Sequence, residues 1–344
     1  MSDNTSSNLI FDDFSEDVTA LKSLSPEHTP NHRVKLFHGN SNPALAKAIS
    51  DSLKLPLGKA MVTTFANGEI REEIKESVRG ARVFVIQPTC GRVNDSLMEL
   101  LIMTDALKRA SAYQVCAVIP YYGYAKQEKR LGREPITAKL VANLLTTAGV
   151  DRVITCDLHA AAIQGFFDIP VDNLSAIPIF LEYIKSKNIN REDLVVVSPD
   201  AGGVTRATKL AEQLGAKLAI IFKRRPEPDK STVIDLVGKV ANKTCIIVDD
   251  MISTGGTLIE GVKALKRHGA KTVYAAVTHA LFASSAVKLI NKSALEELIV
   301  TDTIPISEEA KKMKKLKILS VANLFAQAIV RTQLYKPISP LFLK

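Results

Sequence analysis

The residues best suited to chemistry lie in one short stretch, 248–257, which reads VDDMISTGGT. Two carboxylates, Asp249 and Asp250, are followed by a loop of hydroxyl-bearing residues and glycines. Free backbone N–H groups in such a loop can bind an anion, and paired glycines let a phosphate approach closely. Adjacent carboxylates can accept hydrogen bonds from two neighbouring sugar hydroxyls. The stretch therefore predicts a site for a pentose 5-phosphate, with the phosphate held by Ser253, Thr254, Gly255, Gly256 and Thr257.

The pattern around this stretch is that of a strand, a tight turn and a helix. An apolar run precedes the two carboxylates, and apolar residues then recur at helical spacing from Leu258 to Leu265. Many glycine-rich turns merely connect two elements, so the alternative is an ordinary turn at a solvated strand end. The combination of an apolar strand, an acidic pair and a hydroxyl–glycine loop favours the phosphate site.

Strand-like and helix-like segments alternate along most of the chain. Near-continuous apolar strands of this kind are typical of parallel sheets that are covered by helices on both faces. We therefore expect an α/β protein with doubly wound, mainly parallel sheets. The runs that predict strands are 34–37, 60–65, 81–87, 115–120, 153–158, 194–197 and 218–222, and the clearest helical patterns are 95–110, 135–145 and 321–331.

Two segments of the chain resemble each other. Residues 106–121 (ALKRASAYQVCAVIPY) align without gaps to residues 264–279 (ALKRHGAKTVYAAVTH). Either two helix–strand units share a composition by chance, or the chain is a duplicated domain. In the second case residues 87–90 stand where Asp249 and Asp250 stand in the other copy, and the first copy has lost its sugar-binding carboxylates.

Length and composition limit the protein class. A chain of 344 residues, 46% of them hydrophobic, can form two domains. No apolar run approaches the roughly 18 residues of a membrane span, so we expect no membrane partner. The four cysteines are widely spaced and form no C-x-x-C pair, which favours buried thiols in the cytoplasm. Residues 1–31 are acidic, contain no arginine and are expected to form a flexible tail.

The net charge of +9 suits a polyanionic ligand. No zinc-finger spacing, RNA-binding aromatic motif or basic helical repeat accompanies this charge, so we expect small phosphorylated substrates rather than nucleic acid. Neither G-x-x-x-x-G-K-[ST] nor G-x-G-x-x-G occurs, and a nucleotide must therefore be held in another way.

Further polar groups are expected near the acidic pair, because the carboxyl ends of parallel strands open into one crevice. These groups are His159, the loop 198–206 with Asp200 at a strand tip, and the basic cluster 223–225. A carboxylate such as Asp200 can hold Mg²⁺, and cations beside it can neutralise a phosphate in transfer. The basic connection 121–138 is either a solvated loop or a mobile flap over phosphates.

On these motifs the chain resembles the ribose-phosphate diphosphokinases, also called phosphoribosyl pyrophosphate synthetases, from about residue 33 to residue 340. A simple phosphoribosyltransferase would share only the stretch 248–257. The other segments that carry the resemblance are 65–69, 120–127, 133–137, 157–159, 164–170, 198–206 and 223–225.

The resemblance implies two tandem domains of the type I phosphoribosyltransferase fold. The first spans 32–170 and includes the C-terminal helical segment 319–340, and the second spans 171–318. It also implies that ribose 5-phosphate and MgATP give 5-phosphoribosyl 1-diphosphate and AMP, in a homo-oligomer built from dimers, a hexamer or smaller.

The resemblance further implies roles for individual residues. Lys223 and Arg225 are expected to act as catalytic cations, and Asp249 and Asp250 to orient the sugar. His159 and Asp200 match magnesium-linked positions. The residues expected to bind ATP are Phe65, Asn67, Glu69, Lys126, Gln127 and His159, and the first three match positions that hold adenine from a neighbouring subunit.

Three departures from the family pattern keep alternatives open. Lys126 stands where most members have arginine, Ser253 stands where common members have aspartate, and the segment between Ala125 and Arg133 is one residue shorter. These departures leave a second hypothesis, a non-catalytic homologue that regulates an active synthetase by co-assembly. A third, a phosphoribosyltransferase that consumes the diphosphate, would need a base-binding hood, which the sequence does not indicate.

Overall fold

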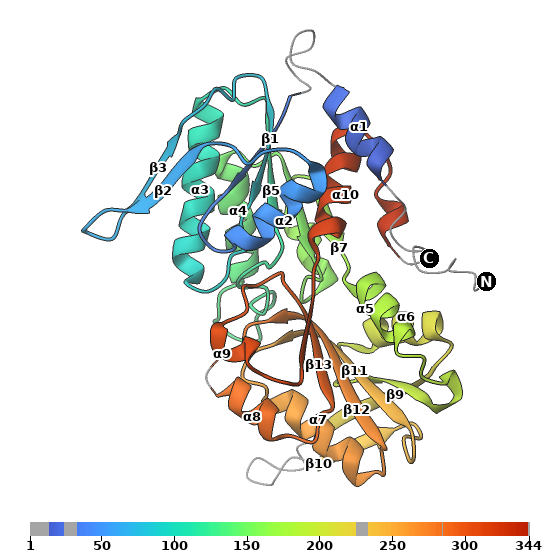
Figure 1. Cartoon of the computed structure of the whole chain (residues 1–344). Helices are drawn as coiled ribbons and strands as arrows, with labels where there is room; N and C mark the ends of the chain where they lie inside the picture. Colours follow the sequence, from blue (N-terminus) through green and yellow to red (C-terminus); the bar gives the residue numbers. More distant parts are fainter. Residues whose placement is uncertain (1–13, 24–32, 225–232, 284, 343–344) are drawn as a thin grey trace, which may run out of the picture.

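The computed structural model describes residues 14–23, 33–224, 233–283 and 285–342 (Figure 1). It has two main β-sheets, each flanked by helices on both faces, and most strands run parallel. The predicted α/β class with mainly parallel sheets is confirmed. Within the described ranges, no helix is both long and apolar enough to span a bilayer.

The first sheet has five parallel strands in the order β1-β4-β5-β6-β7. A separate antiparallel hairpin, β2–β3, is inserted between α2 and β4. The strands are β1 (Val34–His38), β2 (Ala60–Thr64), β3 (Ile70–Ile74), β4 (Arg82–Ile86), β5 (Gln114–Ile119), β6 (Arg152–Cys156) and β7 (Val171–Leu174). The helices are α2 (Pro43–Leu53), α3 (Val93–Arg109), α4 (Thr137–Ala148) and the 3₁₀ turn η2 (Ala161–Phe166).

The second sheet has seven strands in the order β10-β9-β8-β11-β12-β13-β14, and only the edge strand β10 is antiparallel to its neighbour. Its strands are β8 (Leu194–Ser198), β9 (Lys217–Arg224), β10 (Val233–Val237), β11 (Thr244–Ile252), β12 (Thr272–Ala280), β13 (Glu297–Thr301) and β14 (Leu316–Leu319). The helices of the second half are α5 (Ile177–Ser186), α6 (Val204–Leu214), α7 (Gly256–Arg267), α8 (Ala286–Lys292) and α9 (Glu308–Lys311), and α10 (Ala322–Gln333) follows them. Short 3₁₀ turns, η3 (Arg191–Asp193) and η4 (Ser339–Leu341), complete the chain.

The order of elements is the same in the two halves. The series β1, α2, β2, β3, β4, α3, β5, α4, β6, η2, β7 is matched by β8, α6, β9, β10, β11, α7, β12, α8, β13, α9, β14. The two segments that resemble each other both run from the end of a helix through a strand, α3–β5 and α7–β12. Their last residues, Tyr121 and His279, meet edge to face with ring centroids 5.0 Å apart. This repetition favours duplication over chance similarity.

The two halves exchange one helix each, because α5 follows β7 but packs on α6, and α10 follows β14 but packs on α2 (Figure 1). The two crossings are built alike. The carboxylate of Asp157 accepts the backbone N–H of Ala176 at the start of α5, at 2.9 Å. The carboxylate of Asp302 accepts the backbone N–H of Val321 at the start of α10, at 2.8 Å.

A continuous apolar core follows from this exchange. In β8 alternate residues face opposite sides of the sheet, so that Leu194 and Val196 join the core under α5 and α6, whereas Val195 and Val197 join the one under α7 and α8. The first of these cores also contains α2, α10 and strands of the first sheet. The two halves are therefore fixed relative to each other by shared apolar packing.

Two expectations about the organisation of the chain need correction. Part of the N-terminal segment 1–31 is not a flexible tail, because residues 15–23 form a helix, α1 (Ser15–Ser23), that packs on α10 with Val18 and Leu21 buried. The expected domain boundary at 170/171 precedes β7, which pairs with β6, so the chain leaves the first sheet only after Leu174. The strands β9 and β10 pair in antiparallel fashion, and residues 225–232 between them lie outside the described residues.

The hairpin β2–β3 packs against α3 through its strand β3. Both carboxyl oxygens of Glu72 are buried and find no hydrogen-bond partner among the described residues. Burial, together with the nearby charge of Glu99 on α3, raises the pKa of Glu72 from 4.5 to about 8. Glu72 therefore favours its neutral form in the folded protein.

We expect Glu72→Gln to become more stable relative to the wild type as pH rises from 4.5 to about 8. The unfolded side chain releases its proton near the lower value and the folded one near the upper value, so wild-type stability falls across this window. Glutamine does not titrate. Urea unfolding at several pH values measures the difference, with the exposed neighbour Glu73→Gln as control. A stability gap that is independent of pH would contradict the prediction.

Candidate active site

The acidic pair and the glycine loop lie where β11 ends and α7 begins. Asp249 and Asp250 are still within β11, which continues to Ile252, and the loop then turns sharply at Gly255, whose φ is +81°. Leu281 and Ala283 donate backbone hydrogen bonds to the carbonyls of Ile252 and Ser253, at 2.9 and 3.0 Å. The loop is thus supported from behind by the segment that follows β12.

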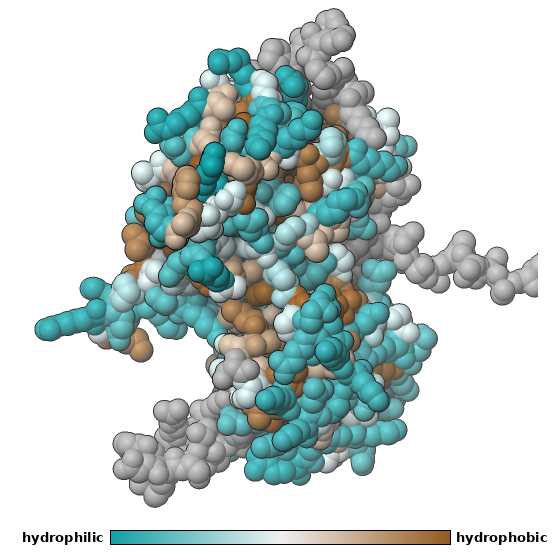
Figure 2. Space-filling view, turned by 60° about the vertical axis from the view of Figure 1, so that its left-hand side comes forward, coloured by the Kyte–Doolittle hydropathy of each residue, from teal (hydrophilic) through white to brown (hydrophobic). Residues whose placement is uncertain are grey.

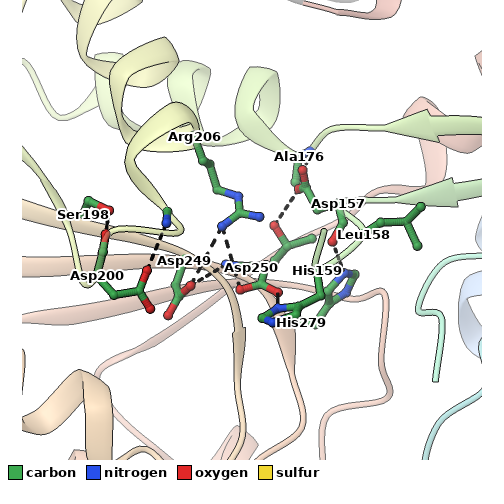
Figure 3. Close-up of polar contacts among 12 residues, drawn as sticks. Asp157, Leu158, His159, Ala176, Ser198, Asp200, Arg206, Asp249, Asp250 and His279 are labelled. Atoms are coloured by element: carbon green, nitrogen blue, oxygen red, sulfur yellow. Dashed lines mark hydrogen bonds and ion pairs between the residues drawn. The ribbon is translucent and has the colours of Figure 1, made fainter. Parts of the chain in front are cut away.

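The two carboxylates are enclosed by cationic and hydrogen-bonding groups from other elements (Figure 3). Nδ1 of His159 donates to Oδ2 of Asp250 at 2.7 Å. The guanidinium of Arg206, on α6, lies 3.9 Å from Asp249 and 3.8 Å from Asp250. The backbone N–H of Asp250 donates to the Asp249 carboxylate at 2.9 Å. The pair is therefore surrounded on more than one side.

These surroundings give the two carboxyl groups opposite pKa shifts. Burial, and then the negative charge of Asp250, raise the pKa of Asp249. Burial also opposes ionisation of Asp250, but the hydrogen bond with His159 and the charge of Arg206 outweigh it and lower the pKa of Asp250. The hydrogen bond with Asp250 in turn raises the pKa of His159. Asp249 is thus the carboxylate that gains most from a further cation or from hydroxyl donors.

His159 is placed by a rigid turn that the first half contributes. Its neighbour Asp157 has φ of +39°, in a region that few non-glycine residues adopt. Thr278, on β12 of the second half, donates to the Asp157 carboxylate at 2.7 Å, and Asn173 accepts the backbone N–H of Leu158 at 3.1 Å. Because Nδ1 of His159 faces a carboxylate, its Nε2 carries the free lone pair.

Asp200 is held by the loop between β8 and α6. Its carboxylate accepts the backbone N–H of Gly203 at 3.0 Å, and Ser198 donates to its carbonyl at 2.7 Å. Figure 3 shows Asp200 and His159 on opposite sides of the acidic pair. Each still has an atom that can contact a ligand.

Most of the predicted site residues line one cavity of about 170 Å³. The molecule is hollowed between its two halves on the face seen in Figure 2. The predicted residues that line the cavity are Lys126, His159, Asp200, Asp249, Asp250, Ser253, Thr254, Gly255, Gly256 and Thr257.

Four predicted ATP-binding residues do not line this cavity. Phe65, Asn67 and Glu69 form the tip of the hairpin β2–β3, where Phe65 is 47% exposed. The guanidinium of Arg71 lies over the Phe65 ring at 5.6 Å. Gln127 is next to Lys126, but its side-chain oxygen accepts a hydrogen bond from Thr137 at 2.5 Å. One copy of the chain therefore does not bring its hairpin tip to its own cavity.

The predicted catalytic cations are only partly described. Lys223 is the penultimate residue of β9, and its backbone pairs with that of Ile234. The side chain of Lys223 and the whole of Arg225 lie outside the described part of the structure.

The sequence patterns indicated no role for Arg206, although this residue ends the predicted loop 198–206. One signal was available. Arg206 is in the first turn of α6, a turn that contains no acidic residue, and a cation there is disfavoured by the helix dipole. An arginine in that place indicates an acidic partner nearby, which the structure identifies as the pair Asp249 and Asp250.

The donor set fits a magnesium ion that arrives with a phosphorylated ligand. Among the described residues, no cluster of three or more His, Cys, Asp and Glu is able to hold a metal by itself. Mg²⁺ is usually bound by one or two protein carboxylates together with water and substrate phosphates. The Asp200 carboxylate and Nε2 of His159 would supply such a partial set.

Two glycines of the loop allow its conformation to be tested separately from ligand binding. Gly255 requires a left-handed backbone, so we expect Gly255→Ala to lower the free energy of unfolding by about 1–2 kcal/mol. A Cβ at Gly256 would meet only the Thr254 hydroxyl, at 3.9 Å, so Gly256→Ala serves as the control with almost unchanged stability. Urea denaturation measures both. Equal stabilities of the two variants would argue against a strained turn.

Family models match both halves of the chain. Residues 34–149 match the N-terminal domain of ribose phosphate pyrophosphokinase, and residues 225–343 match the phosphoribosyl synthetase-associated domain.

Curated relatives match along almost their entire length. A ribose-phosphate pyrophosphokinase of Fusobacterium nucleatum is 54% identical over 312 residues, which cover 90% of this chain and 98% of the relative. One from Bacillus subtilis is 53% identical over 310 residues, which cover 90% and 97%. The crystal structure of phosphoribosylpyrophosphate synthetase from Mycobacterium smegmatis matches with a TM-score of 0.83 and 44% identity, over 87% of this chain and 98% of that one. These findings confirm the resemblance, and the chain belongs to the ribose-phosphate pyrophosphokinase family.

Proposed function

We propose that this protein transfers the diphosphoryl group of MgATP to the 1-hydroxyl of ribose 5-phosphate, giving 5-phosphoribosyl 1-diphosphate and AMP for nucleotide biosynthesis. The observation that carries the proposal is the match, at 54% identity over 98% of its length, to a relative named ribose-phosphate pyrophosphokinase. The cavity lined by an acidic pair, a glycine loop, His159 and Asp200 supports it.

The sugar phosphate occupies the end of β11. Asp249 and Asp250 accept hydrogen bonds from the neighbouring hydroxyls of the ribose, and the loop 253–257 binds the 5-phosphate through backbone N–H groups and hydroxyls. Gly255 supplies the left-handed backbone that the turn of this loop requires, with φ of +81°.

The nucleotide lies across the cavity from the sugar phosphate, near Lys126 and His159. Asp200 and Nε2 of His159 would each be available to contact Mg²⁺ that is bound to the phosphates of ATP. When bound, the ion neutralises phosphate charge and lowers the pKa of a coordinated hydroxyl. Lys126 adds a point charge in place of the bidentate fork that arginine would provide.

The reaction is an in-line displacement at the β-phosphorus. A bond forms between the 1-oxygen of the sugar and the β-phosphorus, and the proton of that hydroxyl is released to solvent. The bond from the same phosphorus to the oxygen shared with the α-phosphate breaks, and AMP leaves. Lys223 and Arg225 neutralise the charge that develops on the transferring group. Positioning of the two substrates supplies much of the remaining rate acceleration.

The active protein is a homo-oligomer, in which Phe65, Asn67 and Glu69 bind the adenine of a neighbouring copy. This assignment is supported by the position of the hairpin tip, which lies outside the cavity of its own chain. A cytoplasmic location is supported by the four cysteines, all of which are buried and free.

The alternative of a non-catalytic regulatory subunit is less well supported. The departures at Lys126 and Ser253 do not remove the cavity, and both residues line it. The relatives that match this chain along nearly their whole length carry the name of the enzyme.

The purified protein is expected to release AMP from MgATP only when ribose 5-phosphate is present. Lys223→Ala should lower turnover at least about a hundredfold, the scale expected for loss of one transition-state donor. Lys217→Ala, an exposed lysine at the opposite end of β9, is the matched control and should retain normal turnover. Near-normal turnover of Lys223→Ala would refute its role, and activity that requires an added partner subunit would favour the regulatory alternative.

Removal of divalent cations with a chelator is expected to abolish AMP release, and added Mg²⁺ should restore it. Asp200→Asn should raise the Mg²⁺ concentration for half-maximal rate about tenfold or more, the scale for losing a group that supports a metal. Rates measured across a magnesium series test this expectation. Full activity in excess chelator would exclude magnesium from the mechanism.

A further inference from the structure

Arg206 is a partly buried cation to which the proposed reaction assigns no role. Its side chain is 17% exposed. Arg206 is not among the described residues that line the cavity, although Asp249 and Asp250 are. It is at the third position of α6, near a helix end that carries positive partial charge. A positive side chain in this place needs compensation by a negative neighbour.

Arg206 approaches both members of the acidic pair at once. Its Nη1 atom is 3.9 Å from Oδ1 of Asp249 and 3.8 Å from Oδ1 of Asp250. The side chains of Asp249 and Asp250 are themselves only 25% and 6% exposed. Among the described residues, Arg206 is the one lysine or arginine that is paired with either carboxylate.

His159 and Arg206 contact different oxygens of the acidic pair. His159 binds Oδ2 of Asp250, whereas Arg206 faces Oδ1 of the same carboxylate. Oδ1 of Asp249 also faces Arg206 and accepts the backbone N–H of Asp250. Figure 3 shows Arg206 reaching between the two carboxylates from α6. The guanidinium thus lies within ion-pair distance of both carboxylates.

Adjacent carboxylates in a poorly solvated place repel each other, and without a shared cation they would turn apart or lose a charge. Either change would disrupt the side-by-side placement of the two carboxylates, which accepts hydrogen bonds from two neighbouring hydroxyls. We propose that Arg206 is a positioning residue for sugar recognition, which holds Asp249 and Asp250 side by side as a paired acceptor for the ribose diol. This inference rests on the proposed function.

Arg206 contacts the acidic pair directly, whereas it reaches His159, which is assigned to ATP, only through Asp250. Loss of its charge therefore weakens the binding of ribose 5-phosphate more than it raises the KM for ATP. Lysine keeps the charge but not the planar, delocalised guanidinium, so it restores binding only in part.

Titration calorimetry of ribose 5-phosphate binding to the full-length protein tests the proposal. Arg206→Gln should weaken binding about tenfold or more and Arg206→Lys by less, the range expected when a buried charge pair is broken. Lys209→Gln removes the same charge from an exposed position of α6 and should bind like the wild type. Steady-state kinetics should show a larger fold increase in the KM for ribose 5-phosphate than in the KM for ATP.

A double-mutant cycle separates positioning from general support of the fold. If Arg206 acts through Asp249, the loss in Arg206→Gln/Asp249→Asn should be clearly smaller than the sum of the two single losses. Wild-type affinity in Arg206→Gln, or equal increases in both KM values with additive losses, would overturn the inference. A wild-type protein that does not bind ribose 5-phosphate would instead overturn the proposed function, and the inference with it.

Discussion

The structure of the site depends on holding two adjacent carboxyl groups side by side in a place with little water. Asp250 is 4% exposed and remains anionic, because His159 from one half donates a hydrogen bond to it and Arg206 from the other half supplies a positive charge. These two interactions replace the hydration that burial removes. Asp249 has fewer partners, and its pKa is raised by burial and by its neighbour. The carboxyl group of Asp249 can therefore accept further hydrogen bonds from a ligand. A diol that donates two hydrogen bonds meets this need better than a single anion would.

The first half has a neutral residue at the position that corresponds to Asp249 in the second half. Ile86 pairs with Val118 as Val248 pairs with Ala276, so Gln87 occupies in the first half the place of Asp249 in the second. Gln87 is fully buried, donates to Glu99 at 2.7 Å and accepts from Ser41 at 2.7 Å. A neutral amide that is satisfied inside its own half needs neither cation nor ligand. The first half thus lacks the acidic pair and contributes His159 to the site, whereas the second half carries the acidic pair and its loop.

Features that depend on neighbours in the sequence could be predicted, and features that depend on tertiary packing could not. The acidic pair and its loop are contiguous, and the alternation of apolar runs was enough to predict a parallel α/β fold. Arg206 reaches the pair only because α6 lies beside β11, and local patterns do not report such proximity. The helix α1 has a largely polar sequence and forms against α10, while β7 reads VDNL and becomes a strand only because β6 pairs with it. The hairpin tip with Phe65 was identified by resemblance, but its distance from the cavity is a property of the fold.

The exchange of α5 and α10 explains why the site can be divided between two halves without losing precision. Asp157 fixes the start of α5 and, two residues before His159, also accepts a hydrogen bond from Thr278 on β12. Displacing either half would therefore disturb the helix crossing and the histidine together. His279 strengthens this link, since its Nε2 contacts the carbonyl of Cys156 at 3.1 Å and its Nδ1 contacts Thr303 at 2.9 Å. Because burial lowers the pKa of His279, it stays neutral and can act as donor on one side and acceptor on the other. Hydrogen bonds made by Asp157 and His279 thus hold the junction between the two halves. The acidic pair, by contrast, faces the cavity, where a ligand can contact it.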